Sequence, residues 1–128
     1  MALIRCTNNA LEVSTLWTNS TPTAQFATQT VTLSDDINNF SYVGITFRFT
    51  TSDATETTCI YPVADFKNFK IGQGYMCGAT VSRAANANIL RRFEYVSDVS
   101  IHFSDGTATS GATTDNSESI PIEIFGLI

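Results

Sequence analysis

Apolar and polar residues alternate along most of this chain with a period of two, which is the pattern of β-strands. The clearest run spans residues 42–49, where one face is predicted to hold Val43, Ile45, Phe47 and Phe49. Successive side chains of a strand point to opposite faces, so the residues between them, Tyr42, Gly44, Thr46 and Arg48, are predicted to lie on the other face. This run is therefore predicted to be a half-buried strand of a sheet.

Similar runs follow one another through the sequence. They are Leu11–Val13, Val31–Leu33, Tyr75–Val81, Ile89–Val96, Val99–Phe103 and Ile120–Ile124. Ile89–Val96 is partly apolar on both faces and is expected to be covered on both, whereas Val99 is expected to point inward with Ile101 and Phe103. Roughly seven to nine short strands at this spacing predict one all-β domain over residues 1–128, an antiparallel, jelly-roll-like β-sandwich.

Turn-forming residues separate the predicted strands. Ser34–Asn39 is expected to hold one helical turn with its two aspartates as turn or cap residues, and residues 52–54 are expected to form a hairpin loop. Ser104-Asp105-Gly106 reads as a further turn. Thr107 to Ser119 contains no large apolar residue, so we predict a mobile surface loop whose replacement by a short turn leaves folding nearly intact. Helical periodicity is otherwise nearly absent.

Composition narrows the function classes. The formal net charge is −5 with only seven Lys and Arg, which argues against a nucleic-acid partner. Thr, Ser and Asn supply 40 of the 128 residues, so the strands carry hydroxyls and amides where most soluble proteins carry charges. No apolar run approaches the roughly 20 residues that span a bilayer, and the N-terminus does not resemble a signal peptide. We therefore expect no membrane insertion and synthesis in a cytoplasm, with release by lysis as the alternative.

Candidate chemistry is sparse. Cys6, Cys59 and Cys77 are odd in number and far apart, so three reduced thiols are expected, with a Cys59–Cys77 bridge as the alternative. The single histidine, His102, falls on the polar face of its predicted strand. No nucleophile elbow and no zinc-ligand spacing is present. We predict no catalytic residue, no cofactor and no zinc site.

A basic pair stands among aromatic residues near the middle of the chain. Arg91, Phe93 and Tyr95 are predicted to share one face of a strand, and Arg92 and Glu94 the other. Aromatic rings beside an arginine can stack on sugars or bases. For Arg92 and Glu94 a structural ion pair is the preferred interpretation.

A few further residues are candidates for partner or receptor contact. They are Trp17, Asp105, Thr109, Asp115 and Asn116. Trp17 would serve either as an exposed sugar platform or as a core anchor, and burial trends favour the anchor. Asp105 and Asp115 would bind a calcium ion if the long loop folded back, and a solvated loop is the alternative.

Four segments are similar to parts of one group of known domains. The segments are Thr15–Ala27, Tyr42–Phe49, Arg91–Phe103 and the ending Ile120-Pro121-Ile122-Glu123-Ile124-Phe125-Gly126-Leu127-Ile128. They resemble the opening, the central strand, the late hairpin and the Ile-Pro…Ile-Tyr-Gly-Ile ending of small β-sandwich domains at the C-terminal tip of bacteriophage tail-fibre and virion structural proteins. Together they cover roughly half of the chain.

This resemblance implies a β-sandwich, usually trimeric, that projects from the virion and contacts the host surface. It supplies no catalytic residues. Such modules end a much longer fibre, whereas Met1 stands almost at the start of this domain. A capsid decoration protein or head fibre is therefore the alternative, and a stand-alone carbohydrate-binding module is the second alternative.

The C-terminus raises the question of assembly. Phe125, Leu127 and Ile128 make it more apolar than a free tail should be. These residues are expected either to form an assembly contact of a homotrimer or to belong to the last strand of the core. The expected partners are copies of this chain, other virion proteins, and a host glycan or protein.

Overall fold

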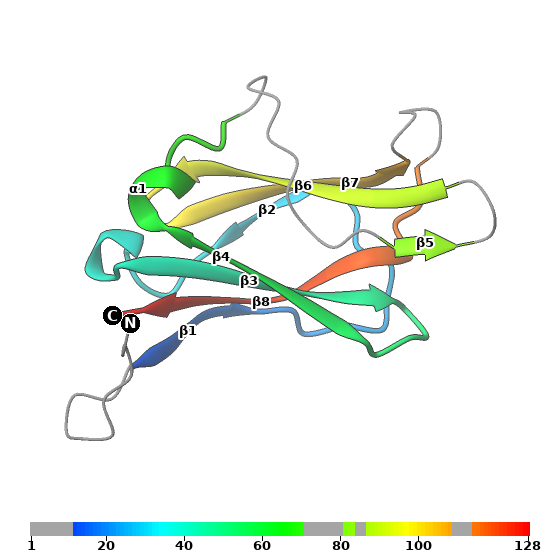
Figure 1. Ribbon diagram of the computed structural model, residues 1–128, viewed down its shortest axis with the longest axis horizontal. Helices are drawn as coiled ribbons and strands as arrows, with labels where there is room; N and C mark the ends of the chain where they lie inside the picture. The colour runs from blue at the N-terminus through cyan, green and yellow to red at the C-terminus, as the bar shows by residue number, and fades with distance from the viewer. Residues whose placement is uncertain (1–11, 71–80, 84–86, 109–113) are drawn as a thin grey trace.

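Two antiparallel four-stranded sheets face each other in the computed structural model, which describes residues 12–70, 81–83, 87–108 and 114–128 (Figure 1). Sheet A has the strand order β1-β8-β3-β4, and sheet B has the order β2-β7-β6-β5. The strands are β1 (Val13–Thr18), β2 (Gln29–Thr32), β3 (Tyr42–Thr50), β4 (Glu56–Pro62), β5 (Val81–Arg83), β6 (Ala87–Ser97), β7 (Ser100–Ala108) and β8 (Glu118–Leu127). The all-β sandwich predicted from the alternating pattern is confirmed.

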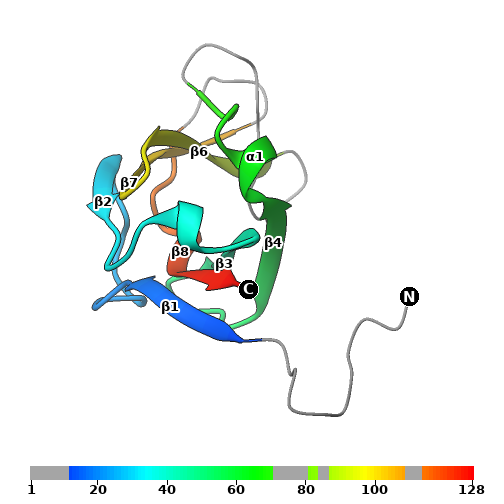
Figure 2. The same cartoon turned by 90° about the vertical axis from the view of Figure 1, so that its left-hand side faces the viewer.

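Strands from the two ends of the chain lie side by side. The first strand pairs with the last, β1 with β8, and the second with the last but one, β2 with β7. Strand β8 also pairs with β3, and the remaining neighbours β3–β4, β5–β6 and β6–β7 are consecutive in the sequence. This rolled arrangement agrees with the jelly-roll-like sandwich expected from the strand spacing. Figure 2 looks along the sandwich and shows the two layers.

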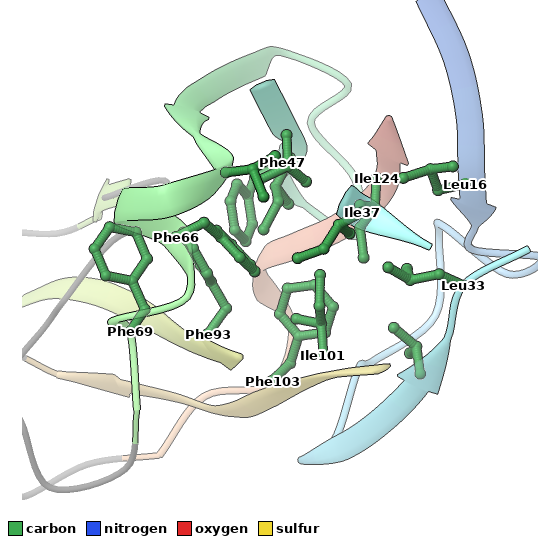
Figure 3. Packing of buried hydrophobic residues seen from close by; sticks show 14 of the residues in the cluster. Leu16, Leu33, Ile37, Phe47, Phe66, Phe69, Phe93, Ile101, Phe103 and Ile124 are labelled. Carbon is green, nitrogen blue, oxygen red and sulfur yellow. The ribbon is translucent and has the colours of Figure 1, made fainter. Parts of the chain in front are cut away.

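One core fills the space between the sheets (Figure 3). Val43, Ile45 and Phe47 of β3 are fully buried, as their alternation predicts. The Phe47 ring lies 6.1 Å from that of Phe93 on β6 and 6.3 Å from that of Phe103 on β7, measured between ring centroids. Because these rings come from both sheets, the aromatic contacts join the two layers.

A short helix, α1 (Val63–Phe66), was not expected from the sequence. Val63, Phe66 and Phe69 are all buried, and the Phe66 ring stacks on Phe93 with 5.7 Å between centroids. After the helix, the amide of Tyr95 on β6 donates to the carbonyl of Phe69 at 2.6 Å. The helical segment thus closes the gap between β4 of sheet A and β6 of sheet B (Figure 2).

Two predicted connections are confirmed. The segment between β2 and β3 contains the 3-10 turn η1 (Ile37–Asn39), and the carboxylate of Asp36 caps it by accepting from the Asn38 amide at 2.8 Å. Residues 52–54 join β3 to β4 as a hairpin loop. Of the run Tyr75–Val81, only its last residue is described, as the first residue of β5.

Other expectations for β6 and β7 are wrong. The second face of β6 is covered only in part, since Arg92 and Val96 are exposed there while Leu90 and Glu94 are half-buried. Val99 is 42% exposed because it lies in the turn between β6 and β7. Ser104-Asp105-Gly106 is not a turn but part of β7, where Gly106 pairs with Arg91 of β6. A β-carbon on Gly106 would lie 2.3 Å from the carbonyl oxygen of Asp115, so this glycine permits a close backbone approach.

The predicted mobile loop Thr107–Ser119 is largely part of the fold. Thr107 belongs to β7, and residues 118–119 begin β8 with at most 1% of their surface exposed. The hydroxyl of Ser119 donates to the carbonyl of Ile89 on β6 at 3.0 Å. Only residues 109–113 lie outside the described residues. A short turn in place of the whole segment would remove these buried groups, so its replacement is expected to weaken the fold rather than leave it intact.

Candidate functional site

The sandwich has two different ends (Figure 1). We call one the α1 end: it holds α1, the β6–β7 turn, the start of β1 and the end of β8. The other, the loop end, holds residues 19–28, the β3–β4 loop and residues 114–117. The residues predicted for partner contact and those predicted for assembly fall at different ends, so each end is considered in turn.

A buried arginine organises the loop end. Arg91 of β6 is 0% exposed, and its guanidinium lies over the ring of Phe26, 5.3 Å from the centroid. Its nitrogens donate to the carbonyls of Ser119 at 2.9 Å, Glu118 at 2.9 Å, Ser104 at 2.8 Å and Phe26 at 2.6 Å. Arg91 and Phe93 are both buried, so this pair offers no stacking surface to a ligand.

The polar residues next to Arg91 form a network of backbone and side-chain hydrogen bonds. Asp105 of β7 accepts from the Thr28 amide and from the side-chain amide of Asn116, both at 2.9 Å. The Asn116 side-chain oxygen in turn accepts from the amide of Gly106 at 2.9 Å, and the amide of Asp115 donates to the Gly106 carbonyl at 2.8 Å. The segment before β8 is therefore attached to β7 at several points.

The charges of this network compensate one another. Burial lowers the pKa of Arg91 to about 10, so the side chain stays a cation at neutral pH, and Asp105 and Asp115 oppose that shift. The pKa of Asp105 is lowered by the hydrogen bond from the Thr28 amide, then by Asn116 and by Arg91. The segment does fold back toward Asp105, as the calcium hypothesis required. The positive charge beside the two aspartates, however, is the guanidinium of Arg91.

Acid is expected to weaken this network. A folded-state pKa of Asp105 below its ordinary 3.8 contributes stability that is present above that value and lost as the pH falls through the folded-state pKa. Asp105→Asn should lower the free energy of unfolding at neutral pH, and the difference from the parent should shrink below about pH 4. Urea unfolding between about pH 7 and pH 3 measures this. Asn116→Ala, which removes one donor to Asp105, should move the acid-induced loss to higher pH, and a pH-independent difference for Asp105→Asn would contradict the assignment.

The other residues predicted for receptor contact differ in where they lie. Trp17 is half-buried, with its ring 5.9 Å from that of Phe103 and 6.2 Å from that of Phe26, so the core-anchor interpretation is confirmed and the exposed platform is wrong. Asp105, Asp115 and Asn116 are partly buried at the loop end. Thr109 lies outside the described residues.

The α1 end carries the exposed apolar side chains. Among the described residues, every exposed large hydrophobic lies toward this end of the sandwich: Val13 62%, Tyr42 44%, Ile60 50%, Val96 51%, Val99 42% and Ile128 57% exposed. Single exposed hydrophobics are ordinary, but their concentration at one end of a domain marks a contact surface.

Four of the strands bring part of this surface together on the outer face of sheet A. The strand register places residues with no formal charge in two rows across β1, β8, β3 and β4, which we call the apolar face: Val13, Leu127, Tyr42, Pro62 and Thr15, Phe125, Gly44, Ile60. The Phe125 ring lies over Gly44, where a β-carbon would come within 2.2 Å of it. Charged residues begin only in the following rows, with Glu123, Arg48 and Glu56.

The three residues predicted for assembly meet different surroundings. Leu127 is 8% exposed and belongs to β8, which lies between β1 and β3, so the last-strand interpretation is confirmed for it. Phe125 is half-buried, and Ile128 is exposed. Phe125 and Leu127 are therefore part of the apolar face, and Ile128 directly follows it.

A shallow hollow of about 380 Å³ lies where the apolar face gives way to charged residues. Its polar lining comes from Thr18, Asn19, Arg48, Glu56 and Glu123. Pro22 and Ile122 complete it with apolar surface. The hollow therefore lies on the outer face of sheet A, toward the loop end.

His102 and the cysteines are the remaining residues considered for chemistry. His102 faces the outer side of sheet B, where its ring nitrogens lie 2.9 Å from the Thr30 hydroxyl and 3.1 Å from that of Thr28. Cys59 is half-buried on β4, while Cys6 and Cys77 lie outside the described residues, so the thiol assignments stay predictions. The described part of the chain contains no group of three or more His, Cys, Asp or Glu side chains placed to hold a metal ion.

Two features of the site were missed from the sequence. The buried arginine had a weak signal, because Arg91 falls on the same face as Phe93 and Ile89, which a solvated arginine would avoid. The hollow had none, since Asn19, Arg48 and Glu123 are distant in the sequence and meet only through the pairing of β1, β8 and β3.

Two comparisons with known proteins found no match. None of the helices in the described segments is long and apolar enough to cross a membrane. No protein-family model matches the sequence, and a search of curated proteins finds no match.

Proposed function

We propose that this protein is a structural module of a bacteriophage virion, which attaches through the α1 end and projects the loop end outward. The observation that carries the proposal is the gathering of the exposed large hydrophobic side chains of the described residues at the α1 end. The resemblance of four segments to tail-fibre tip domains supports the virion assignment. No catalysis is assigned to the protein.

Copies of the same chain are the proposed occupants of the apolar face. Each chain carries a formal net charge of −5, so a contact that brought the acidic side chains of two copies together would be opposed by their repulsion. The two rows of the apolar face hold no charged residue and include Tyr42, Phe125 and Ile60. Burying such a surface costs little polar desolvation, and aromatic residues are enriched in the centres of interfaces. The trimer implied by the resemblance is the proposed state.

Ile60→Lys should abolish this self-association. The substitution places a charge in the apolar face at a position that is 50% exposed, so the fold can accept it while the contact cannot. Thr58→Lys is the matched control, because Thr58 is exposed one row further along the same face of β4. Sedimentation at micromolar concentration should give about three times the 13.9 kDa of one chain for the parent and the control, and one chain for Ile60→Lys.

Two outcomes would count against the proposal. A parent protein that sediments as a monomer, and that is not recovered from purified particles, would remove both the trimer and the virion assignment. Ile60→Lys that remains trimeric would show that the copies meet through another surface.

A capsid decoration protein or head fibre is the alternative within the same class. The apolar face would then seat the module on a capsid protein, and labelling of the protein on intact particles would distinguish capsid from tail. The stand-alone carbohydrate-binding module would need an exposed aromatic platform, and Trp17 does not provide one because it packs against Phe26 and Phe103 in the core.

A further inference from the structure

The hollow on sheet A has a fixed polar framework. The side-chain amide of Asn19 donates to the carbonyl of Pro121 at 2.9 Å, and its oxygen accepts from the Thr21 amide at 2.8 Å. The Arg48 guanidinium donates to the carbonyls of Thr50 at 2.8 Å and Thr51 at 3.3 Å. These bonds hold both side chains in place, so the groups at the hollow are oriented before any ligand arrives.

Acceptors and donors alternate across this hollow. Glu123 is on β8, Arg48 on the neighbouring β3 and Glu56 on β4, directly opposite Arg48 in the strand register. The Arg48 guanidinium is therefore carried by the strand that lies between the strand of Glu123 and the strand of Glu56. One oxygen of Glu123 accepts from the Thr15 hydroxyl at 2.8 Å, which orients that carboxylate. Thr18 adds a hydroxyl at the β1 side.

This charge pattern selects the kind of ligand. An anion such as phosphate would meet two carboxylates, and a divalent cation would meet the guanidinium. A neutral ligand with several hydroxyl groups suits both, because carboxylates accept from hydroxyls and the guanidinium donates to them. Pro22 and Ile122 offer apolar surface to the C–H groups of such a ligand. The volume of about 380 Å³ lies within the range of small-ligand sites.

We propose that the hollow binds a neutral saccharide unit, with Glu123 and Glu56 as acceptors and Arg48 as donor. The binding chemistry stands on the hollow alone. Its biological meaning, recognition of a host-surface glycan by a projecting module, rests on the proposed function. The hollow adjoins the apolar face, because Glu123, which lines the hollow, accepts a hydrogen bond from Thr15 of that face.

Nuclear magnetic resonance titration of the full chain tests this binding directly. The probes are the methyl glycosides of glucose, galactose, mannose and N-acetylglucosamine, with sialic acid, inorganic phosphate and calcium chloride as competing classes. At least one neutral glycoside should shift the backbone resonances of Ile122, Glu123 and Arg48, with a Kd on the order of 1 mM. Resonances of the α1 end should stay unchanged.

Three variants locate the site. Glu123→Gln and Glu56→Gln keep the size of each side chain and remove its charge, so each should weaken glycoside binding about tenfold. Asp65→Asn removes an exposed carboxylate on α1, at the opposite end, and should leave the titration unchanged. Because Glu56 is exposed, Glu56→Gln remains informative even if Glu123→Gln disturbs the β1–β8 pairing.

Several results would overturn the proposal. They are shifts caused only by sialic acid or phosphate, shifts caused only by calcium, no shift with any probe, and equal binding by the two glutamine variants and the parent. The test does not depend on assembly, since it can be repeated on monomeric Ile60→Lys. Glycoside binding by a chain that neither associates nor is recovered from purified particles would refute the virion module and keep the saccharide site, and a trimer without binding would do the reverse.

Discussion

Arg91→Met is expected to lower the free energy of unfolding by about 3–5 kcal/mol, the range found when one partner of a buried charged network is removed. The guanidinium is fully buried and satisfies the carbonyls of Phe26, Ser104, Glu118 and Ser119. Methionine fills much of the volume but donates no hydrogen bond, so these buried acceptors lose their partner. Denaturant unfolding monitored by fluorescence and circular dichroism measures the loss.

The neighbouring arginine provides a matched control. Arg92 is exposed on the opposite face of the same strand, so Arg92→Met should change the free energy of unfolding by no more than about 0.5 kcal/mol. Arg91→Lys should also be strongly destabilising, because one ammonium group cannot reproduce the planar fork that reaches carbonyls on several segments. A loss for Arg91→Met as small as that for Arg92→Met would show that Arg91 does not hold the loop end together.

Phe47→Ala should cost about 3–5 kcal/mol of unfolding free energy. Phe47 is 0% exposed, and its ring contacts those of Phe93 and Phe103 from the facing sheet. Removing it leaves a cavity between the two layers and breaks aromatic contacts that add to the lost apolar burial. The midpoint of thermal or denaturant unfolding should fall accordingly.

Phe49→Ala tests whether burial rather than residue type sets that cost. Phe49 lies two residues further along β3 and is only half-buried, so the same substitution there should be clearly less destabilising. Equal losses at the two positions, or an unchanged unfolding midpoint for Phe47→Ala, would contradict the assignment of Phe47 to the centre of the core.

Local patterning explains how much of the fold could be predicted. Alternation in residues 42–49 gave the strand and its buried face, because side chains of a strand must point to alternate sides. The same reasoning was wrong for β6, where Leu90 and Val96 suggested that the second face is covered, whereas Val96 is exposed. It also missed α1, although the spacing of Val63, Phe66 and Phe69 at every third residue was a usable helical signal.

The turn wrongly predicted at residues 104–106 shows a second limit of local patterning. A Ser-Asp-Gly sequence is typical of turns, yet Gly106 lies within β7. A glycine stands there because the backbone of Asp115 approaches too closely for a side chain. Asp115 and Asn116, which belong to the predicted loop Thr107–Ser119, are bonded to Gly106 and are therefore part of the fold. Such a glycine looks like a turn glycine until its distant neighbour is known.

The sequence by itself determined the all-β class and the strand at β3, because these depend on neighbouring residues and on composition. Only the tertiary structure decided that Arg91 is buried among carbonyls, that the exposed hydrophobics gather at the α1 end, and that Glu123, Arg48 and Glu56 share a hollow. The physical reason is strand pairing: β1 meets β8, and β8 meets β3, across much of the chain length. Which strands pair depends on the free energy of the whole sandwich, and no local pattern carries that information.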